Sequence, residues 1–187
     1  MTYPVSTAEF MEHVRYTADA SELSQAEMML GSATAFAEQY TGRRFMTTTL
    51  VSNFDRFPTD TRKAPLAVLG GSVSSILSIT YYDTDYVQQT LAPSLYRLIN
   101  KNDRGFIYSA MGKEWPTNVA TGEPDVITLT YSVGGSADSV PASVRSAILL
   151  IAASLWENRE NEIVGSNIKA LKPSTAAKDL LHPYKLR

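Results

Sequence analysis

The residues of this 187-residue chain that could carry out chemistry are few and widely separated. The two histidines, His13 and His182, lie near opposite ends of the sequence, and neither has the spacing of a catalytic triad or a metal site. The chain has no cysteine, which excludes disulfides, thiolate catalysis and zinc sites built on sulfur. We therefore expect no catalytic residue, no cofactor and no bound metal.

Two aspartates are the best candidates for a divalent cation. Asp83 and Asp85 could supply oxygen ligands, but the glycine and the distal glutamate of a calcium loop are missing. The alternative is a hairpin turn, which aspartate favours because its side chain accepts hydrogen bonds from nearby backbone groups. The turn explains the pattern better.

Two further charged groups have ordinary structural explanations. Glu157, Glu160 and Glu162 suggest acid/base chemistry, but Arg159 lies among them and favours surface ion pairs. The pair Arg43-Arg44 could contact phosphate. However, cations near the C-terminus of a helix are stabilising in their own right.

Composition and charge narrow the class of protein. The formal net charge of -2 argues against a dedicated nucleic-acid-binding protein. The distribution is uneven: residues 1–40 hold six acids and one base, whereas residues 169–187 hold five bases and one acid. No apolar run is long enough to cross a bilayer, and the first residues do not resemble a signal peptide. We expect a soluble protein made inside the cell.

Helical periodicity occurs at both ends of the chain. Ser6 and Glu9 form a capping box that predicts a short helix over residues 7–15. A long apolar stripe with Gly42 just beyond its end predicts a second helix over 22–41. Pro141 suits the first position of a third helix over 141–159.

The third predicted helix is apolar on more than one side. One stripe consists of Val144, Ala147, Ile148, Ile151, Ala152 and Leu155, and the second of Leu149, Leu150, Ala153 and Trp156. Both stripes must be covered. Either this helix runs through the centre of the subunit or it faces a neighbouring copy.

Between the helices the pattern is that of strands. Alternating β-branched and aromatic residues, separated by Gly, Pro and Asp, predict a small antiparallel β subdomain over residues 45–133. Ile127, Leu129 and Tyr131 share one face of its last strand. The fold class predicted is α+β, a helical core with this inserted subdomain. Residues 1–159 form one domain, and 160–187 form an extended tail too apolar to be a plain linker.

Nine segments occur in an order that is similar to one known family. They are residues 35–44 at the end of the second helix, 65–66, 73–81, 95–98, 115–116, 126–131, 140–150, 156–160 and 180–184. In this order the chain resembles the head-to-tail connector proteins of tailed bacteriophages, also called adaptor or head completion proteins, over nearly its whole length.

The resemblance implies a structural virion protein and not an enzyme. Members of this family form a ring, usually of twelve copies, beneath the portal protein of the capsid. The ring leaves a channel through which the genome passes and binds a stopper or tail protein below. The protein would be assembled in the bacterial host cytoplasm and located in the virion neck. DNA would pass without sequence-specific binding, and no membrane would be involved.

Three groups of residues are the expected contacts of such a ring. The acid-rich front suits a DNA channel because like charge avoids adhesion to phosphate; its candidates are Glu9, Glu12, Asp19 and Glu22. The expected contacts between neighbouring copies are Leu149, Leu150, Ala153, Trp156 and Arg159. The expected tail contacts with the portal are Lys169, Leu171, Lys172, Lys178, Leu180, Leu181, Tyr184 and Lys185.

Three alternatives stay open. The tail could instead fold back on its own subunit. The protein could be another neck or tail component, such as a stopper or a tail terminator. From a different class, it could be a metal-dependent enzyme or binding module using Asp83, Asp85 and the cluster from Glu157 to Glu162.

Overall fold

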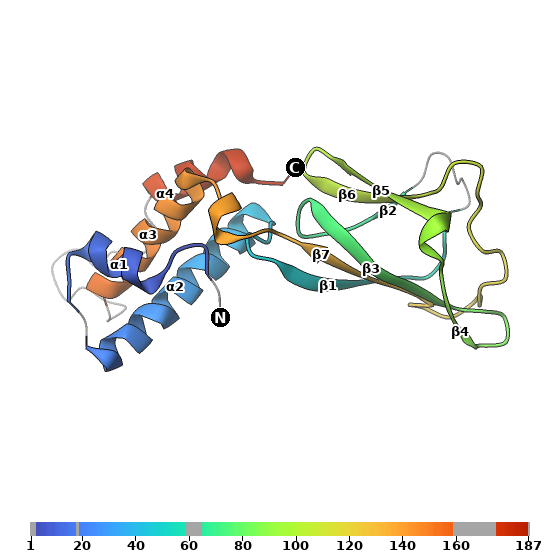
Figure 1. The fold of residues 1–187 in the computed structure, drawn as a ribbon, viewed down its shortest axis with the longest axis horizontal. Coiled ribbons are helices and arrows are strands. Elements are labelled where there is room, and N and C mark those ends of the chain that lie inside the picture. The colour runs from blue at the N-terminus through green and yellow to red at the C-terminus, as the bar shows by residue number, and fades with distance from the viewer. Residues whose placement is uncertain (1–2, 18, 59–64, 159–174, 187) are drawn as a thin grey trace, which may run out of the picture. The chain divides into compact units, whose positions relative to one another are not determined.

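The computed structural model divides the chain into two compact units. It describes residues 3–17, 19–58, 65–158 and 175–186. A helical unit combines both ends of the chain, residues 1–46 and 136–185, and a β unit consists of residues 47–135 (Figure 1). The α+β fold class, a helical core with a small antiparallel β subdomain inserted, is confirmed. No helix among the described residues has the length and hydropathy needed to cross a membrane.

The helical unit contains α1 (Thr7–Val14), α2 (Ala20–Thr41), α3 (Ala142–Glu157) and α4 (Thr175–Leu181). Two capping boxes start α1 and α2, with Ser6 and Asp19 as the N-caps. Gly42 ends α2 in the left-handed conformation at φ 74°, which glycine adopts without steric cost. Pro141 is the N-cap of α3, one residue before the first helical position where we expected it.

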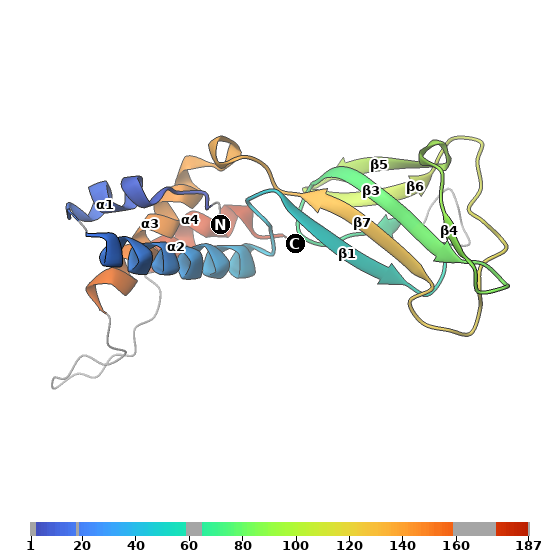
Figure 2. The same ribbon diagram turned by 60° about the horizontal axis from the view of Figure 1, so that its bottom comes forward.

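α3 is the central helix of this unit. It packs against α1, α2 and α4, and Figures 1 and 2 show these three helices around it. α2 packs against α3, and Leu30 of α2 and Ile148 of α3 are both fully buried in the same apolar cluster. The short 3-10 helices at Ala137–Ser139 and His182–Tyr184 precede α3 and follow α4.

The β unit contains two antiparallel sheets. The larger has the order β1 (Thr48–Phe54), β7 (Ile127–Val133), β3 (Val73–Tyr82) and β4 (Gln88–Thr90). The smaller has the order β2 (Leu66–Ala67), β6 (Arg104–Ser109) and β5 (Tyr96–Lys101), with a 3-10 helix at Pro93–Leu95 before β5. In Figure 2 the strands of the larger sheet run side by side.

One apolar core joins the two sheets. Ile79 of β3, Leu129 of β7 and Ile107 of β6 are fully buried in it. The predicted inward face of β7 is confirmed, since Ile127, Leu129 and Tyr131 are all buried. Two irregularities in the pairing of β3 with β7, at Val73/Ser75 and Ile76/Ser78, each place an extra residue in β3.

Candidate interaction surfaces

Three of the four acidic residues expected to face a channel act as helix caps. The backbone N–H of Ser6 donates to the Glu9 carboxylate at 2.9 Å, and those of Ser21 and Glu22 donate to Asp19 Oδ1, each at 2.9 Å. Glu22 accepts from the Asp19 backbone N–H at 3.0 Å. The acid-rich front is therefore explained in part by the need of two helix starts for acceptors.

These contacts lower the pKa of two of the carboxyls. The Ser6 backbone N–H is the largest cause of the lowered pKa of Glu9, with a smaller contribution from the Arg145 guanidinium, which forms an ion pair with it. The Glu22 backbone N–H is the largest cause of the lowered pKa of Asp19. Both side chains stay ionised at neutral pH and lie at the surface. Glu12 is exposed as well.

The second apolar stripe of α3 packs in part against the core of its own subunit. The four described residues of the expected ring contact, Leu149, Leu150, Ala153 and Trp156, are partly buried against the helical core. Trp156 makes ring contacts with Phe10, at 5.9 Å between centroids, and with Tyr16, at 5.7 Å. The chain itself therefore covers part of this stripe, and the part that stays exposed remains a proposed contact with a neighbouring copy. Arg159 lies outside the described residues.

The described part of the C-terminal tail folds back onto the helical unit. Leu181 of α4 is fully buried in the core that α2 and α3 form, and Leu180 and Tyr184 pack against the same core. This corrects the expectation that Leu181 inserts into a partner: α3 needs an apolar cover, and α4 supplies it. Lys169, Leu171 and Lys172 lie outside the described residues.

Side chains on three elements fasten this tail segment. The Tyr184 hydroxyl and the Ser143 Oγ are 2.8 Å apart, and the Arg43 Nε donates to the Tyr184 carbonyl. The Lys185 Nζ lies 5.4 Å from the centroid of the Tyr40 ring. Lys185 is exposed and Lys178 is half-buried, so both ammonium groups of this segment remain near the surface.

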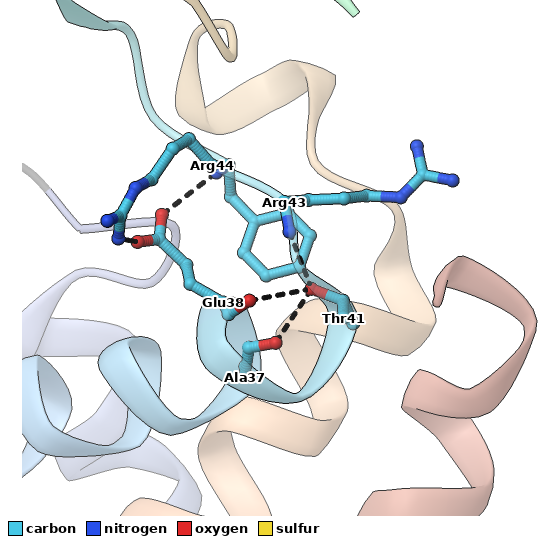
Figure 3. Close-up of polar contacts among 6 residues, drawn as sticks. Ala37, Glu38, Thr41, Arg43 and Arg44 are labelled. Carbon is cyan, nitrogen blue, oxygen red and sulfur yellow. Dashed lines mark hydrogen bonds and ion pairs between the residues drawn. The ribbon is translucent and has the colours of Figure 1, made fainter. Parts of the chain in front are cut away.

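The Arg43-Arg44 pair serves the C-terminus of α2 (Figure 3). Arg44 forms an ion pair with Glu38 at 2.6 Å, and the same carboxylate accepts from the Phe45 backbone N–H at 2.9 Å. The Arg43 side chain runs away from this pair and ends at the Tyr184 carbonyl. Both arginines therefore have structural partners close to the end of α2. This favours the structural role of the pair over the phosphate contact that the sequence also allowed.

Asp83 organises a hairpin turn. Its carboxylate accepts from the backbone N–H groups of Val87 at 2.9 Å and Asp85 at 3.0 Å, and from the Gln89 side chain at 2.8 Å. These bonds, that from Val87 first, lower its pKa against the opposing effect of burial. Among the described residues no group of three or more potential ligands could hold a metal ion. The turn is confirmed as the role of Asp83.

The strand region contains a surface that was not anticipated. All four strands of the larger sheet lack charged residues, and its outer face exposes Val51 and Leu77. The sequence shows long stretches without charged residues in this region. It does not show which of these residues share a surface, because that depends on the order of the strands and on the side of the sheet to which each side chain points.

Three solved structures contain chains with a similar fold. The chain is similar to a chain in the neck of an empty gene transfer agent (GTA) particle computed with C6 symmetry, with a TM-score of 0.75 and 20% identity over 98% of this chain and 91% of that one. It is similar to a chain in the virion of the native particle, with a TM-score of 0.70 and 18% identity over 100% of this chain and 94% of that one.

A third similar chain comes from the neck of the native GTA particle computed with C12 symmetry. Its TM-score is 0.68, with 21% identity over 97% of this chain and 88% of that one. No protein-family model and no curated protein matches the sequence. The chain therefore shares the fold of chains found in GTA particles, two of them from necks, along its whole length.

Proposed function

We propose that this protein is a structural neck component of a phage-like particle, a head-to-tail adaptor that joins the capsid to the tail and has no enzymatic role. The observation that carries the proposal is the whole-chain likeness to chains of GTA necks, which includes both the helical unit and the inserted β unit. The order of segments shared with the connector family supports it independently.

The proposed assembly is a ring of identical subunits, by analogy with the twelvefold symmetry of one similar neck. The portal protein would lie above the ring and a stopper or tail protein below it. Glu9, Glu12, Asp19 and Glu22 would repel the phosphates of passing DNA, and the lowered pKa values of Glu9 and Asp19 keep these two carboxyls charged while they cap helices.

Portal binding would involve the basic part of the tail. Lys178 and Lys185 keep their ammonium groups near the surface while α4 is anchored by apolar contacts. We assign portal contact to these two lysines together with Lys169, Leu171 and Lys172. Neighbouring copies in the ring would meet through the exposed part of the second α3 stripe, Leu149, Leu150, Ala153 and Trp156, and through further surfaces.

Cryo-EM of the particle neck tests the proposal. The expected result is a ring of this chain directly beneath the portal, with the tail component attached to its opposite side. A position farther from the head would identify a stopper or tail terminator instead. A particle without this protein would overturn the structural role.

Deletion of the gene provides a second test. Particles made without the protein should contain packaged heads and separate tails, because the junction cannot form. Expression of the wild-type protein from a plasmid is the control and should restore joined particles. Normal particles after deletion would contradict the proposal.

A further inference from the structure

The larger sheet of the β unit lacks charge to an unusual degree. Charged residues make up 19% of the chain, yet β1, β3, β4 and β7, of 7, 10, 3 and 7 residues, contain none. Natural sheets protect their exposed edge strands with charged residues or proline. Interfaces, in contrast, are depleted of charge at their centres.

The strand register places the exposed side chains of this sheet in rows. Val51 lies opposite Thr130, which lies opposite Ser78, with the bulge residue Leu77 beside it. Val51 is 59% and Leu77 is 56% exposed. The next row consists of Asn53, Thr128, Thr80 and Thr90. We call these residues the uncharged face.

The hairpin between β3 and β4 exposes apolar side chains that could pack against the uncharged face. Tyr86 and Val87 at its tip are 59% and 54% exposed. The Tyr86 N–H donates to the Asp83 carbonyl at 2.9 Å, and the Asp83 carboxylate binds the Val87 N–H, so the tip has one defined shape. Order in advance of binding lowers the entropic cost of association.

Tyr86 occupies this tip in a costly conformation. Its φ of 59° lies in the left-handed region, which favours glycine and asparagine over bulky residues. Turns of this kind normally carry glycine at the left-handed position. A tyrosine at that position adds an amphipathic ring at the expense of backbone strain, as is found at binding sites.

We propose that the β3–β4 hairpin of one copy docks on the uncharged face of a second copy, with Tyr86 and Val87 packed against Val51 and Leu77. This inference rests on the ring of the proposed function and names a contact between neighbouring copies in that ring. A cyclic ring needs two different surfaces on each subunit, and the hairpin tip at Tyr86 and Val87 and the face at Val51 and Leu77 are two such surfaces.

The absence of charge on the uncharged face also favours the β3–β4 hairpin as the segment that binds there. A partner with charged groups over Val51 and Leu77 would bury those charges without counter-ions, at a large cost. The hairpin offers Tyr82, Tyr86, Val87 and Gln88, all uncharged and exposed. Asp83 has its carboxylate occupied by three donors, and Asp85 would lie at the rim of the contact.

Disulfide trapping between single-cysteine variants tests the contact directly, because the natural chain has no cysteine. Val51→Cys, carrying a size tag, is mixed with untagged Tyr86→Cys at about 1 mM, where even weak specific association is populated. The mixed disulfide is expected under mild oxidation of an equimolar mixture and should exceed either symmetric product by clearly more than the factor of about two that random pairing gives. Met111→Cys replaces Tyr86→Cys in the control, since Met111 is 86% exposed in the same unit.

Absence of an excess of the mixed product over the Met111 control overturns the inference. A mixed product that is no more than about twice either symmetric product overturns it too, because random collision gives that ratio.

Substitutions at the tip separate binding from folding. Tyr86→Gly suits the left-handed backbone, so the protein should melt at the same or a higher temperature, yet its association should weaken about tenfold or more, as loss of an interface tyrosine does. Val51→Lys should weaken association similarly, and Met111→Lys should not. A Tyr86→Gly variant that associates normally overturns the inference.

The same variants distinguish this contact from the ring itself. If cryo-EM shows a ring but the mixed disulfide does not form, the adaptor function stands and the contact is wrong. If the mixed disulfide forms but no ring occurs in the neck, the contact stands and the proposed function fails.

Discussion

At the scale of single residues, acidic side chains do much of the local structural work in this protein. Glu9, Asp19 and Glu22 satisfy backbone N–H groups at two helix starts, and Asp83 does the same in a hairpin. The first N–H groups of a helix have no partner within the helix, so loss of a capping acid removes their acceptor. The contributions of capping and of charge to stability can be separated by substitutions that keep the hydrogen-bond acceptor but remove the charge.

Asp19→Ala should lower the melting temperature of the protein, whereas Asp19→Ser should change it little. Serine is a good N-cap without charge, and alanine offers no acceptor for the Ser21 and Glu22 N–H groups. Thermal unfolding followed by circular dichroism measures both. Equal losses for alanine and serine would show that the charge of Asp19, not its capping, is what matters.

The pH dependence of stability should show an acid limb to which Asp83 contributes. Its pKa in the folded protein lies below the ordinary 3.8, so its contribution is present above pH 3.8 and is lost as pH falls through the folded-state pKa. Glu9, lowered from 4.5, acts in the same sense.

Asp83→Asn keeps an acceptor for two N–H groups and removes the ionisation. We expect this variant to be less stable than the parent at neutral pH and to lose less stability on acidification. Urea unfolding at a series of pH values measures this. Parallel pH profiles for the two proteins would contradict the assignment.

At the scale of elements, α3 organises the helical unit because one of its apolar stripes is largely buried and the other is partly buried within the chain. α2 covers one side, and α4 and α1 cover others. A helix of this kind is stable only when every cover is present. Its contacts with α2 and α4 can be tested separately.

Leu30→Ala in α2 should lower the free energy of unfolding by about 2–5 kcal/mol, as truncation of a buried leucine does. Leu30 is fully buried, whereas Met28 of the same helix is 65% exposed. Met28→Ala is the matched control and should change stability by less than about 0.5 kcal/mol. Urea unfolding of both variants decides whether the α2–α3 core is assigned correctly.

Leu181→Ala in α4 should also cost about 2–5 kcal/mol, because Leu181 is fully buried against the helical core. A chain truncated after Gly165 lacks α4 and should bind an apolar dye and aggregate, since α3 loses part of its cover. Asp179→Ala, at an exposed position of the same helix, is the control. If the truncated chain melts like the parent, α4 is not part of the core and is available for a partner.

At the scale of the whole molecule, the protein has two apolar cores and a net charge near zero. We expect the contacts between copies in the proposed ring to be individually weak. Many weak contacts become strong only when a template aligns the subunits. The portal would be that template.

The isolated protein should therefore be monomeric at micromolar concentration and form a ring only with portal present. Light scattering coupled to size-exclusion chromatography gives the mass under both conditions. The weak self-association trapped at about 1 mM is compatible with this result. A closed and stable ring of the isolated protein at low concentration would contradict it.

Sequence reasoning succeeded where the physics is local. The capping box at Ser6 and Glu9 and the left-handed Gly42 depend on residues within a few positions, so their types predicted the structure. The same holds for the inward face of β7, whose alternation follows from strand geometry. The predicted helices over 7–15, 22–41 and 141–159 compare with α1 at 7–14, α2 at 20–41 and α3 at 142–157.

Only the tertiary structure decided which surfaces are covered. The apolar stripe with Leu149 and Trp156 demanded a cover, but its composition is the same whether a neighbouring copy or the chain's own α1 and α4 supplies it. Likewise, the order β1-β7-β3-β4 and the bulge at Leu77 place uncharged residues from distant segments on one face. Burial is a property of contacts between segments far apart in the chain, and no local pattern contains it.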